Sequence, residues 1–405
     1  MRRHRLVAFG ALAVAACLSA CASLFGFEEL TFSPDASTPP DAPTSPEPDG
    51  STVPTTCETS KRPPSRPDSG TGEDSLELTF AIDRFDVGIR PDGGGLAAPN
   101  GFDLDETCTD EPSQSSCVTR ASPGQFADYV KDKAGGVDNA AFVLLQLLGD
   151  SLGKDAPFTP DQINGGLRRG RFGFLLDVKG YNGEANDQNV RVSFRPSLGT
   201  TDAGAPRFDG NDEWALDTEF ANTEDFLGGK FIDVTAYVRD SVLYTAFPEL
   251  VLPIQRSANG NVLRIVLRDV LVSARIDKVG SKLALSQGVV AGKWPVEDAF
   301  AGIRKVAYGS DEVSTLCSQP EYDTQFRQRA CGALDIRQGL GRDAAAPCDA
   351  LSVGFGFAAS QTKAAVKVET RVYRDVTCPR VDCTSPLDAG FISEEAGTFD
   401  ATPPP

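Results

Sequence analysis

The chain has 405 residues, with 57 acidic and 39 basic side chains, ten cysteines, one methionine and one histidine. The single histidine, His4, lies in an N-terminal segment with the features of a cleaved leader, so the mature chain has none. Catalytic triads and dyads that need a histidine base, and zinc sites with histidine ligands, are therefore excluded.

The first 21 residues are typical of an export signal followed by a lipidation site. Three arginines precede an apolar run from Leu6 to Leu18, which is too short to span a bilayer as a mature helix. The segment Leu18-Ser19-Ala20-Cys21 resembles the lipobox of bacterial lipoproteins. This resemblance, confined to residues 1–21, implies a signal peptide over 1–20 and a lipid anchor, including palmitate, on Cys21.

A second lipobox match ends at Cys17, and the parity of the cysteines favours Cys21. Lipidation of Cys21 leaves eight thiols in the mature chain, which can form four disulfides, whereas lipidation of Cys17 leaves nine. A plain secreted protein with an accidental cysteine is the alternative. Ala22 is not the aspartate that retains many lipoproteins at the inner membrane, so the resemblance implies an outer-membrane or cell-surface location.

Loss of the leader removes three arginines and no acid, which changes the net charge from −18 to −21. So acidic a surface repels phosphate backbones, and we expect no nucleic-acid partner. Solubility is the simplest reason for the charge, and loosely bound divalent cations are the functional alternative.

Composition divides the mature chain into a tether, a body and a tail. Residues 21–75 form the predicted tether, and ten prolines between residues 34 and 67 leave too few apolar side chains to drive folding. The acidic, proline-ended segment 384–405 is predicted to be disordered as well. Residues 76–383 form the body, which is long enough for one large domain or two.

Alternating apolar residues predict that strands dominate the body. The expected strands are 76–89 with a bulge near Asp83 and Arg84, 171–178 and 190–194 around a turn at Asn182-Gly183, 232–238, 263–276 with a change of phase, and a hairpin of 353–357 with 366–372. Helical spacing predicts helices at 137–152, 295–306 and 320–330. The predicted fold is therefore mainly β, an antiparallel β-sandwich-like body with a few short helices.

The cysteines of the mature body lack the C-x-x-C spacing of redox and zinc sites, so we predict disulfide staples. The eight candidates are Cys57, Cys108, Cys117, Cys317, Cys331, Cys348, Cys378 and Cys383. Closure of short loops favours Cys108 with Cys117 and Cys317 with Cys331. Cys57 would then join the tether to Cys348, Cys378 or Cys383.

Two catalytic motifs occur without the partners that they need. Gly149-Asp150-Ser151-Leu152-Gly153 matches the GDSL string and the G-x-S-x-G elbow, but a histidine base is missing and a predicted helix precedes Ser151. Ser151 with Lys154 matches S-x-x-K, the pair used by penicillin-binding proteins, yet Ser360 with Lys363 matches it equally well. We therefore expect neither motif to be catalytic.

Acidic loops are the other candidate sites. The aspartates near Cys108 and Trp214 offer oxygen ligands of the kind that calcium prefers, although neither loop has EF-hand spacing. The candidates are Asp103, Asp105, Asp110, Asp209 and Asp212. Solvated acidic loops are the alternative, and no cofactor beyond a possible structural calcium ion is expected.

The sequence favours an anchored lipoprotein with a non-enzymatic binding or envelope-structural role. A lipid anchor and a long tether would display the body, and its ligand would be an unidentified protein or glycan. One alternative is a carbohydrate-active enzyme that uses paired carboxylates. The other is a lipid-handling envelope protein whose apolar strands and helix line a cavity.

Lipidation at Cys21 is tested by metabolic labelling with a palmitate analogue. We expect the wild-type chain to be labelled and Cys21→Ala to remain unlabelled, because that thiol carries the lipid in the lipobox resemblance. A wild-type chain that takes up no label would contradict the lipoprotein assignment, and label retained in Cys21→Ala would place the lipid elsewhere.

Overall fold

The computed structural model describes residues 60–68, 76–86, 100–125, 129–142, 144–145, 159–201, 204–221, 229–255, 262–306, 315–339, 343–372 and 376–383. All of them belong to one compact unit, Thr52–Pro405. Cys21, Cys57, the pair Ser151 and Lys154, and the predicted tail 384–405 lie outside the described residues. None of the helices in the described ranges has the length and apolar character needed to cross a membrane.

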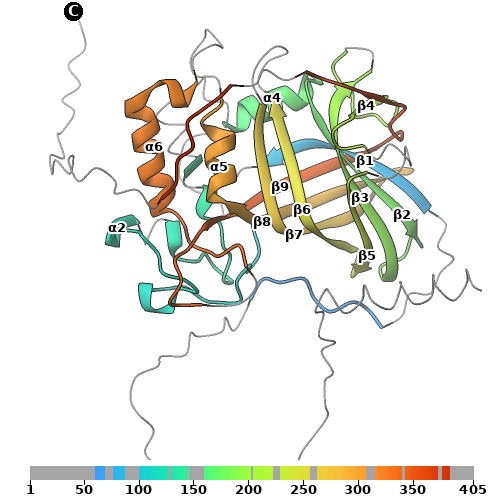
Figure 1. The fold of residues 1–405 in the computed structure, drawn as a ribbon. Helices are drawn as coiled ribbons and strands as arrows, with labels where there is room; N and C mark the ends of the chain where they lie inside the picture. The colour runs from blue at the N-terminus through green and yellow to red at the C-terminus, as the bar shows by residue number, and fades with distance from the viewer. Residues whose placement is uncertain are drawn as a thin grey trace, which may run out of the picture. The chain divides into compact units, whose positions relative to one another are not determined.

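Ten strands of the described chain form one sheet (Figure 1). They are β1 (Leu76–Asp86), β2 (Gly173–Tyr181), β3 (Asp187–Thr200), β4 (Trp214–Asp217), β5 (Phe231–Arg239), β6 (Val242–Gln255), β7 (Val262–Val279), β8 (Lys282–Pro295), β9 (Ala350–Thr362) and β10 (Lys367–Glu369). The helical elements are η1 (Pro112–Gln114), α2 (Pro123–Gln125), α4 (Pro160–Arg168), α5 (Val296–Ile303), η4 (Leu316–Ser318) and α6 (Pro320–Gly332).

The sheet closes into an eight-stranded antiparallel barrel, because β3 pairs with β5 as well as with β2. The first part of β3 pairs with β5, from Asp187 opposite Val238 to Phe194 opposite Phe231. The end of β3 turns away to pair with β4. The predicted β class is confirmed, but the predicted sandwich is wrong. Alternating apolar residues fit both architectures, and only the β3–β5 pairing distinguishes them.

Apolar side chains fill the interior of the barrel, as expected for eight strands. Phenylalanine rings from β9, β1, β2, β3 and β6 contact one another in series, with centroids 5.4 to 6.4 Å apart. They are Phe355, Phe85, Phe174, Phe194 and Phe247, each at most 3% exposed. Helix α4 packs against β1, so that apolar burial continues beyond the strands.

Several predicted features of the strands are confirmed. The register of β1 against β9 shifts between Ile82 and Arg84, at the predicted bulge. Strands β2 and β3 pair across the turn that follows Tyr181. In β7 the phase changes at Asp269, which has a φ of 49° and lies beside the register shift that begins at Arg268.

The predicted hairpin of 353–357 with 366–372 is wrong. Strand β9 pairs with β1 on one side and β8 on the other, so it has no free edge for a hairpin partner. Strand β10 pairs instead in parallel with β4. Strands β6 and β8 were not predicted. In β6, Pro248 and Pro253 lie beyond the three residues that pair with β5, where a proline interrupts no ladder bond on that side.

The helices begin largely where the sequence predicts. Pro295 is the N-cap of α5, and Pro320 is the first residue of α6. Of the predicted helix 137–152, residues 140–142 and 144–145 are described and are helical, whereas residues 137–139 are described and are not helical, so the predicted start at Val137 is wrong. Helix α4 was not predicted, although Thr159 caps it by accepting a hydrogen bond from the Gln162 amide at 3.3 Å.

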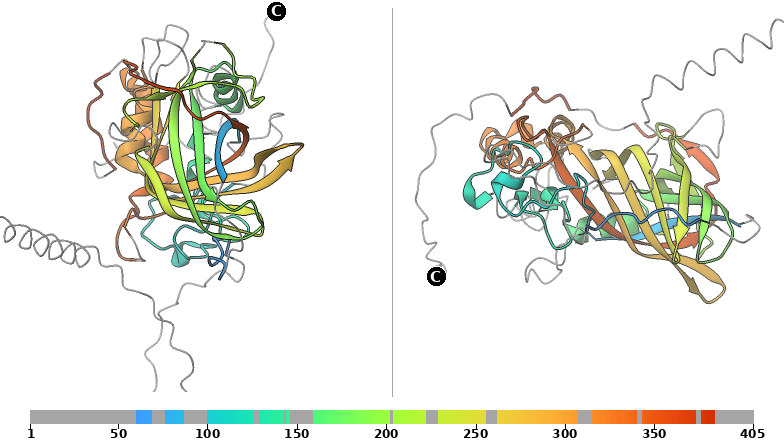
Figure 2. Two further views of the ribbon diagram at one scale, coloured as in Figure 1. Left: turned by 90° about the vertical axis from the view of Figure 1, so that its right-hand side faces the viewer. Right: turned by 90° about the horizontal axis from the view of Figure 1, so that it is seen from below.

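Residues 60–68, which we call the strap, lie along the body although they belong to the predicted tether (Figure 2). At one end the Lys61 amide donates to the Gly135 carbonyl at 2.9 Å. At the other end Arg239 of β5 donates to the Ser65 carbonyl at 2.7 Å, and Arg66 donates to the Thr235 carbonyl at 2.5 Å. The chain is therefore joined to the body before β1 begins.

Disulfides staple the helical part of the body, as predicted, but with other partners. The bonds are Cys117–Cys348, Cys317–Cys378 and Cys331–Cys383. The predicted pairs Cys108–Cys117 and Cys317–Cys331 are wrong, and the three suggested partners of Cys57 are bonded elsewhere. The pairing predicted from short-loop closure is wrong because the tertiary fold brings distant segments together. The Cys348 amide, for example, donates a hydrogen bond to the carbonyl of Val118, the residue after Cys117.

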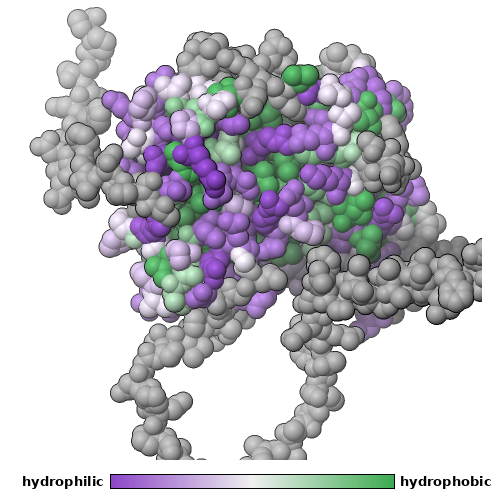
Figure 3. All heavy atoms as spheres, viewed as in Figure 1, coloured by the Kyte–Doolittle hydropathy of each residue, from purple (hydrophilic) through white to green (hydrophobic). Residues whose placement is uncertain are grey.

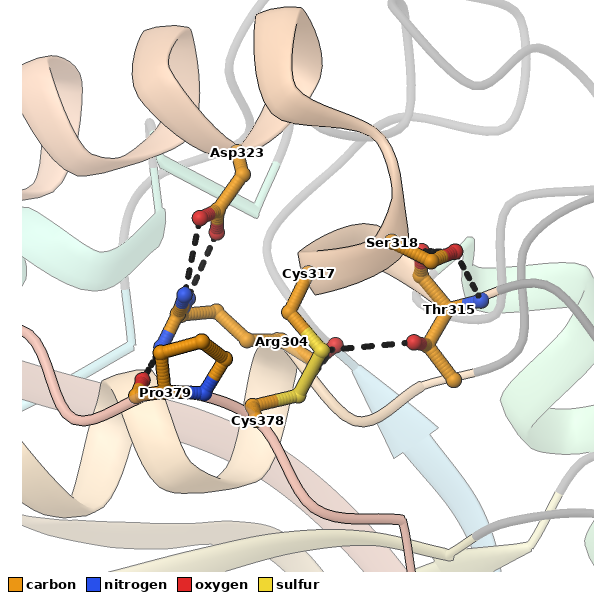
Figure 4. A network of polar contacts seen from close by, with 7 residues as sticks. All are labelled: Arg304, Thr315, Cys317, Ser318, Asp323, Cys378 and Pro379. Atoms are coloured by element: carbon orange, nitrogen blue, oxygen red, sulfur yellow. Dashed lines mark hydrogen bonds and ion pairs between the residues drawn. A yellow bond between two sulfur atoms is a disulfide. The ribbon is translucent and has the colours of Figure 1, made fainter.

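A buried ion pair reinforces the Cys317–Cys378 staple (Figure 4). The guanidinium of Arg304, just after α5, binds the Asp323 carboxylate of α6 through two contacts of 2.5 and 2.8 Å. It also donates to the Pro379 carbonyl at 2.5 Å. Because the Arg304 side chain is only 4% exposed, this bidentate pair holds α5, α6 and the C-terminal segment together.

Cys108 is disulfide-bonded as well, and its partner lies outside the described residues because the other described cysteines pair among themselves. We predict a bond to Cys57, the remaining thiol of the predicted mature set. Non-reducing digestion and mass spectrometry should yield a linked peptide that contains both cysteines.

Replacement of Cys57 by serine should expose one alkylatable thiol at Cys108 and cost about 4 kcal/mol of stability, the chain-entropy value for a loop of about 50 residues. The unreduced wild-type chain, as the control, should not be alkylated at either position. Alkylation of Cys57 in the wild type would contradict the pairing.

Candidate functional site

A groove of about 460 Å³ lies on the outer face of the barrel, over β1, β9, β8, β7 and the start of β6. Core residues of these strands point into the barrel, and polar, charged and glycine residues make up most of the groove lining, together with Val242, Val289 and Phe357. The described lining residues are Lys61, Arg84, Asp86, Asn100, Val242, Ser273, Arg275, Gln287, Gly288, Val289, Gly356 and Phe357. Its volume is within the usual range for a site that binds a small ligand.

The strand register shifts beside the groove in three successive pairings. The shifts fall between Ile82 and Arg84 in β1, between Ser273 and Arg275 in β7, and between Leu285 and Gly288 in β8. Gln287, within the last of these, has a φ of 48°. Register irregularities of this kind re-aim side chains and often adjoin functional sites.

Two glycines that line the groove are tightly packed against neighbouring side chains. A Cβ atom at Gly288 would lie 2.6 Å from the Phe357 ring, and one at Gly356 would lie 2.6 Å from Asn100 Nδ2. No larger residue fits at either position without displacement of its neighbour. The Gly356 backbone of β9 therefore forms part of the groove floor, whereas the absent side chain at Gly288 leaves room for the Phe357 ring of the barrel core.

The groove concentrates positive charge on an acidic protein. Lys61, Arg84 and Arg275 line it with a single carboxylate among the described lining residues, Asp86. Arg275 forms an ion pair with Asp277 at 3.1 Å. Burial lowers the pKa of Lys61, because removal of water disfavours an ammonium group that has no anionic partner among the described residues. A negatively charged ligand would supply that partner.

A second polar feature, the aspartate cluster, lies in the loops before α4 and next to β9. We define it as Asp103, Asp105, Asp132, Asp138 and Asp335. One carboxylate oxygen from each of Asp103, Asp105 and Asp138 lies within 4.8 Å of the other two. Backbone amides orient the carboxylates: Leu104 donates to Asp138 at 2.6 Å and Thr107 donates to Asp105 at 2.9 Å.

Asp335 is tied to β9 at the edge of the cluster. Its carboxylate accepts the Ser352 amide at 2.8 Å and the Ser352 hydroxyl. The same hydroxyl accepts the Ala140 amide at 2.8 Å. Asn139, the residue before Ala140, donates to the carbonyls of Asn100 and Gly354. These bonds connect the aspartate cluster to the strand that forms the groove floor.

Burial and mutual repulsion raise the pKa values within the aspartate cluster. The pKa of Asp132 rises to about 7 and that of Asp335 to about 8, with burial as the largest cause in both. The pKa of Asp138 lies well above its ordinary value for the same reason, with further increases from Asp105, Asp132 and Asp335. The cluster therefore favours a counter-charge, either protons or a cation.

The structure brings together only part of the predicted calcium set. Asp103 and Asp105 belong to the aspartate cluster, whereas the Asp110 side chain is 72% exposed and pairs with Lys131. Asp209 and Asp212 lie in a separate turn, where the Asp212 carboxylate accepts the amides of Arg207 and Phe208. Asp132, Asp138 and Asp335 were missed, because no local spacing relates them to Asp103.

The described S-x-x-K motif does not form a catalytic pair. Ser360 donates to Asp83 at 2.5 Å, and Lys363 lies 3.5 Å from Glu213. Ser360 and Lys363 therefore bond to other residues and not to each other.

Large exposed apolar side chains are scattered over several elements rather than gathered at one place. Hydrophilic and apolar side chains intermingle across the face shown in Figure 3. Among the described residues, the large exposed apolar side chains are Val118, Val234, Val279, Tyr322, Val366 and Val372. The described surface therefore shows no gathered apolar patch, and the groove is the candidate site for recognition on it.

The fold and these features define a closed antiparallel β-barrel with a disulfide-stapled helical flank, a cationic outer groove and a buried aspartate cluster. No protein-family model, curated protein or solved structure matches the chain.

The raised pKa of Asp335 predicts how stability depends on pH. The folded state holds this proton up to about pH 8, whereas the ordinary value is 3.8. The stabilising contribution is therefore fully present below about pH 4 and is lost as the pH rises toward 8. Asparagine is an isosteric analogue of protonated aspartic acid. The melting temperature of Asp335→Asn should therefore fall less than that of the wild type between pH 5 and pH 8.

Thermal melts in the presence of a chelator measure this difference, with the exposed Asp110→Asn as the control. Equal losses in the wild type and Asp335→Asn would contradict the assignment.

Proposed function

We propose that the protein is a lipid-anchored, non-enzymatic binding protein of the bacterial outer membrane or cell surface, and that its groove binds an acidic glycan. The anchor rests on the lipobox resemblance at Cys21. The observation that carries the ligand class is the convergence of Lys61, Arg84 and Arg275 on one groove, beside three successive register shifts.

The groove chemistry suits a charged sugar polymer. Arginine recognises carboxylate and sulfate groups through paired donors. Asn100, Ser273 and Gln287 add amide and hydroxyl groups that can bind sugar hydroxyls. An open groove on the outer face also leaves room for a chain to continue beyond the bound unit.

The alternative of glycoside hydrolysis gains no support from the groove. Hydrolysis by this route needs two carboxyl groups that flank the scissile bond. Asp86 is the only carboxylate among the described lining residues. A lipid-handling role gains no support either, because buried phenylalanine rings occupy the described interior of the barrel.

Binding to acidic and neutral oligosaccharides on an array, followed by calorimetry, tests the proposal. We expect the wild type to bind acidic members, with affinity that falls as salt concentration rises. Arg84→Gln and Arg275→Gln should each weaken binding roughly tenfold, the effect of losing about 1.4 kcal/mol of a charged contact. Arg191→Gln, on the exposed surface of β3, is the matched control.

Unchanged affinity in both groove variants, or the absence of binding to any acidic glycan, would overturn the proposal. Turnover of a bound glycan would instead favour the carbohydrate-active alternative.

A further inference from the structure

The geometry of the aspartate cluster matches the spacing of ligands around one metal ion. Oxygens of Asp103, Asp105 and Asp138 lie within 4.8 Å of one another. Two oxygens that bind the same calcium ion at about 2.4 Å are at most about 4.8 Å apart. The three side chains therefore already have a separation that a single ion can bridge.

Asp103 provides an independent sign of a missing ligand. Asp103 is only 2% exposed. Its Oδ2 atom accepts a hydrogen bond from the Ser60 hydroxyl at 2.5 Å and lies 3.7 Å from Arg62 Nε. Its Oδ1 atom is completely buried and has no hydrogen-bond partner. Such an oxygen is costly, since water has been removed and nothing replaces it. A cation bound to Oδ1 would remove that cost.

The donor set selects the kind of ion. All three side chains offer hard carboxylate oxygens, the predicted mature chain has no histidine, and the described cysteines are in disulfides. Zinc and copper prefer nitrogen or sulfur ligands, whereas calcium takes six to eight oxygens from carboxylates, carbonyls and water. Magnesium demands a stricter octahedron and gives up its water reluctantly.

We propose that Asp103, Asp105 and Asp138 bind one calcium ion, with backbone carbonyls or water completing its coordination. Asp132 adds negative charge beside Asp138. The site does not depend on the nature of the groove's ligand, so either proposal can fail without the other.

The ion would fix the point where the strap meets the body. The Asp103 amide donates to the Lys61 carbonyl at 3.1 Å, and the Lys61 amide donates to Gly135, three residues before Asp138. Calcium would therefore cross-link the loops on both sides of the strap. Lys61 is also a wall residue of the groove, so the same ion would steady one side of it.

Calorimetric titration of the purified mature protein with calcium chloride, after treatment with chelator, tests the proposal. We expect a single site per chain and a higher melting temperature with calcium than with chelator. Magnesium at the same concentration should produce a smaller rise. Asp103→Asn and Asp105→Asn should each weaken calcium binding at least tenfold, whereas Asp110→Asn, in the same segment but exposed, should bind like the wild type.

Circular dichroism and intact disulfides establish that each variant is folded. If Asp103→Asn does not fold, the less buried Asp105→Asn decides the outcome. Absence of calcium binding in the wild type would overturn the proposal. Equal affinity in the wild type and Asp105→Asn, or equal weakening in Asp110→Asn, would overturn it too, since binding would then arise elsewhere or from surface charge alone.

Discussion

The pairing of β3 with β5 is the constraint on which the rest of the structure depends. It joins β5, at one end of the row of strands, to β3, the third strand from the other end, so that the backbone groups of the eight strands between and including them find partners within the barrel. Closure also separates two environments. The interior takes apolar side chains that pack ring against ring, and it holds the scaffold together. The outer face is left to polar residues and to the segments that cross it, and the features suited to recognition gather there.

The segments outside the barrel are held by a small number of strong connections. Disulfides bind Cys117 to Cys348 and two helical cysteines to the segment 376–383. The strap is bonded at both ends, near Gly135 and on β5. Because the connections are covalent or charge-assisted, short segments with little apolar area remain in place. They supply one wall of the groove and the loops of the aspartate cluster.

Buried charged side chains are neutralised in two contrasting ways. Arg195 with Asp177 and Arg304 with Asp323 are buried pairs in which a guanidinium directly neutralises a carboxylate, at 2.7 and 2.5 Å. The aspartate cluster instead places several carboxylates together, with Arg62 beside Asp103. In the first case the protein supplies its own counter-charge. In the aspartate cluster the negative charge is balanced by protons or by an ion from solution. The cluster can therefore respond to the pH or the ion concentration of its surroundings.

The sequence by itself determined the β class, the bulge near Asp83 and Arg84, the starts of α5 and α6 at prolines, and the use of cysteines as disulfides. These features follow from local periodicity, fixed backbone angles and residue chemistry. Only the tertiary structure decided that the sheet closes, that β10 pairs with β4, which cysteines pair, and that Asp103 meets Asp138. The groove also arises from strands far apart in the chain. Such contacts depend on which strands pair and on closure of the sheet, and the alternation of apolar residues within one strand does not identify the strand that it pairs with.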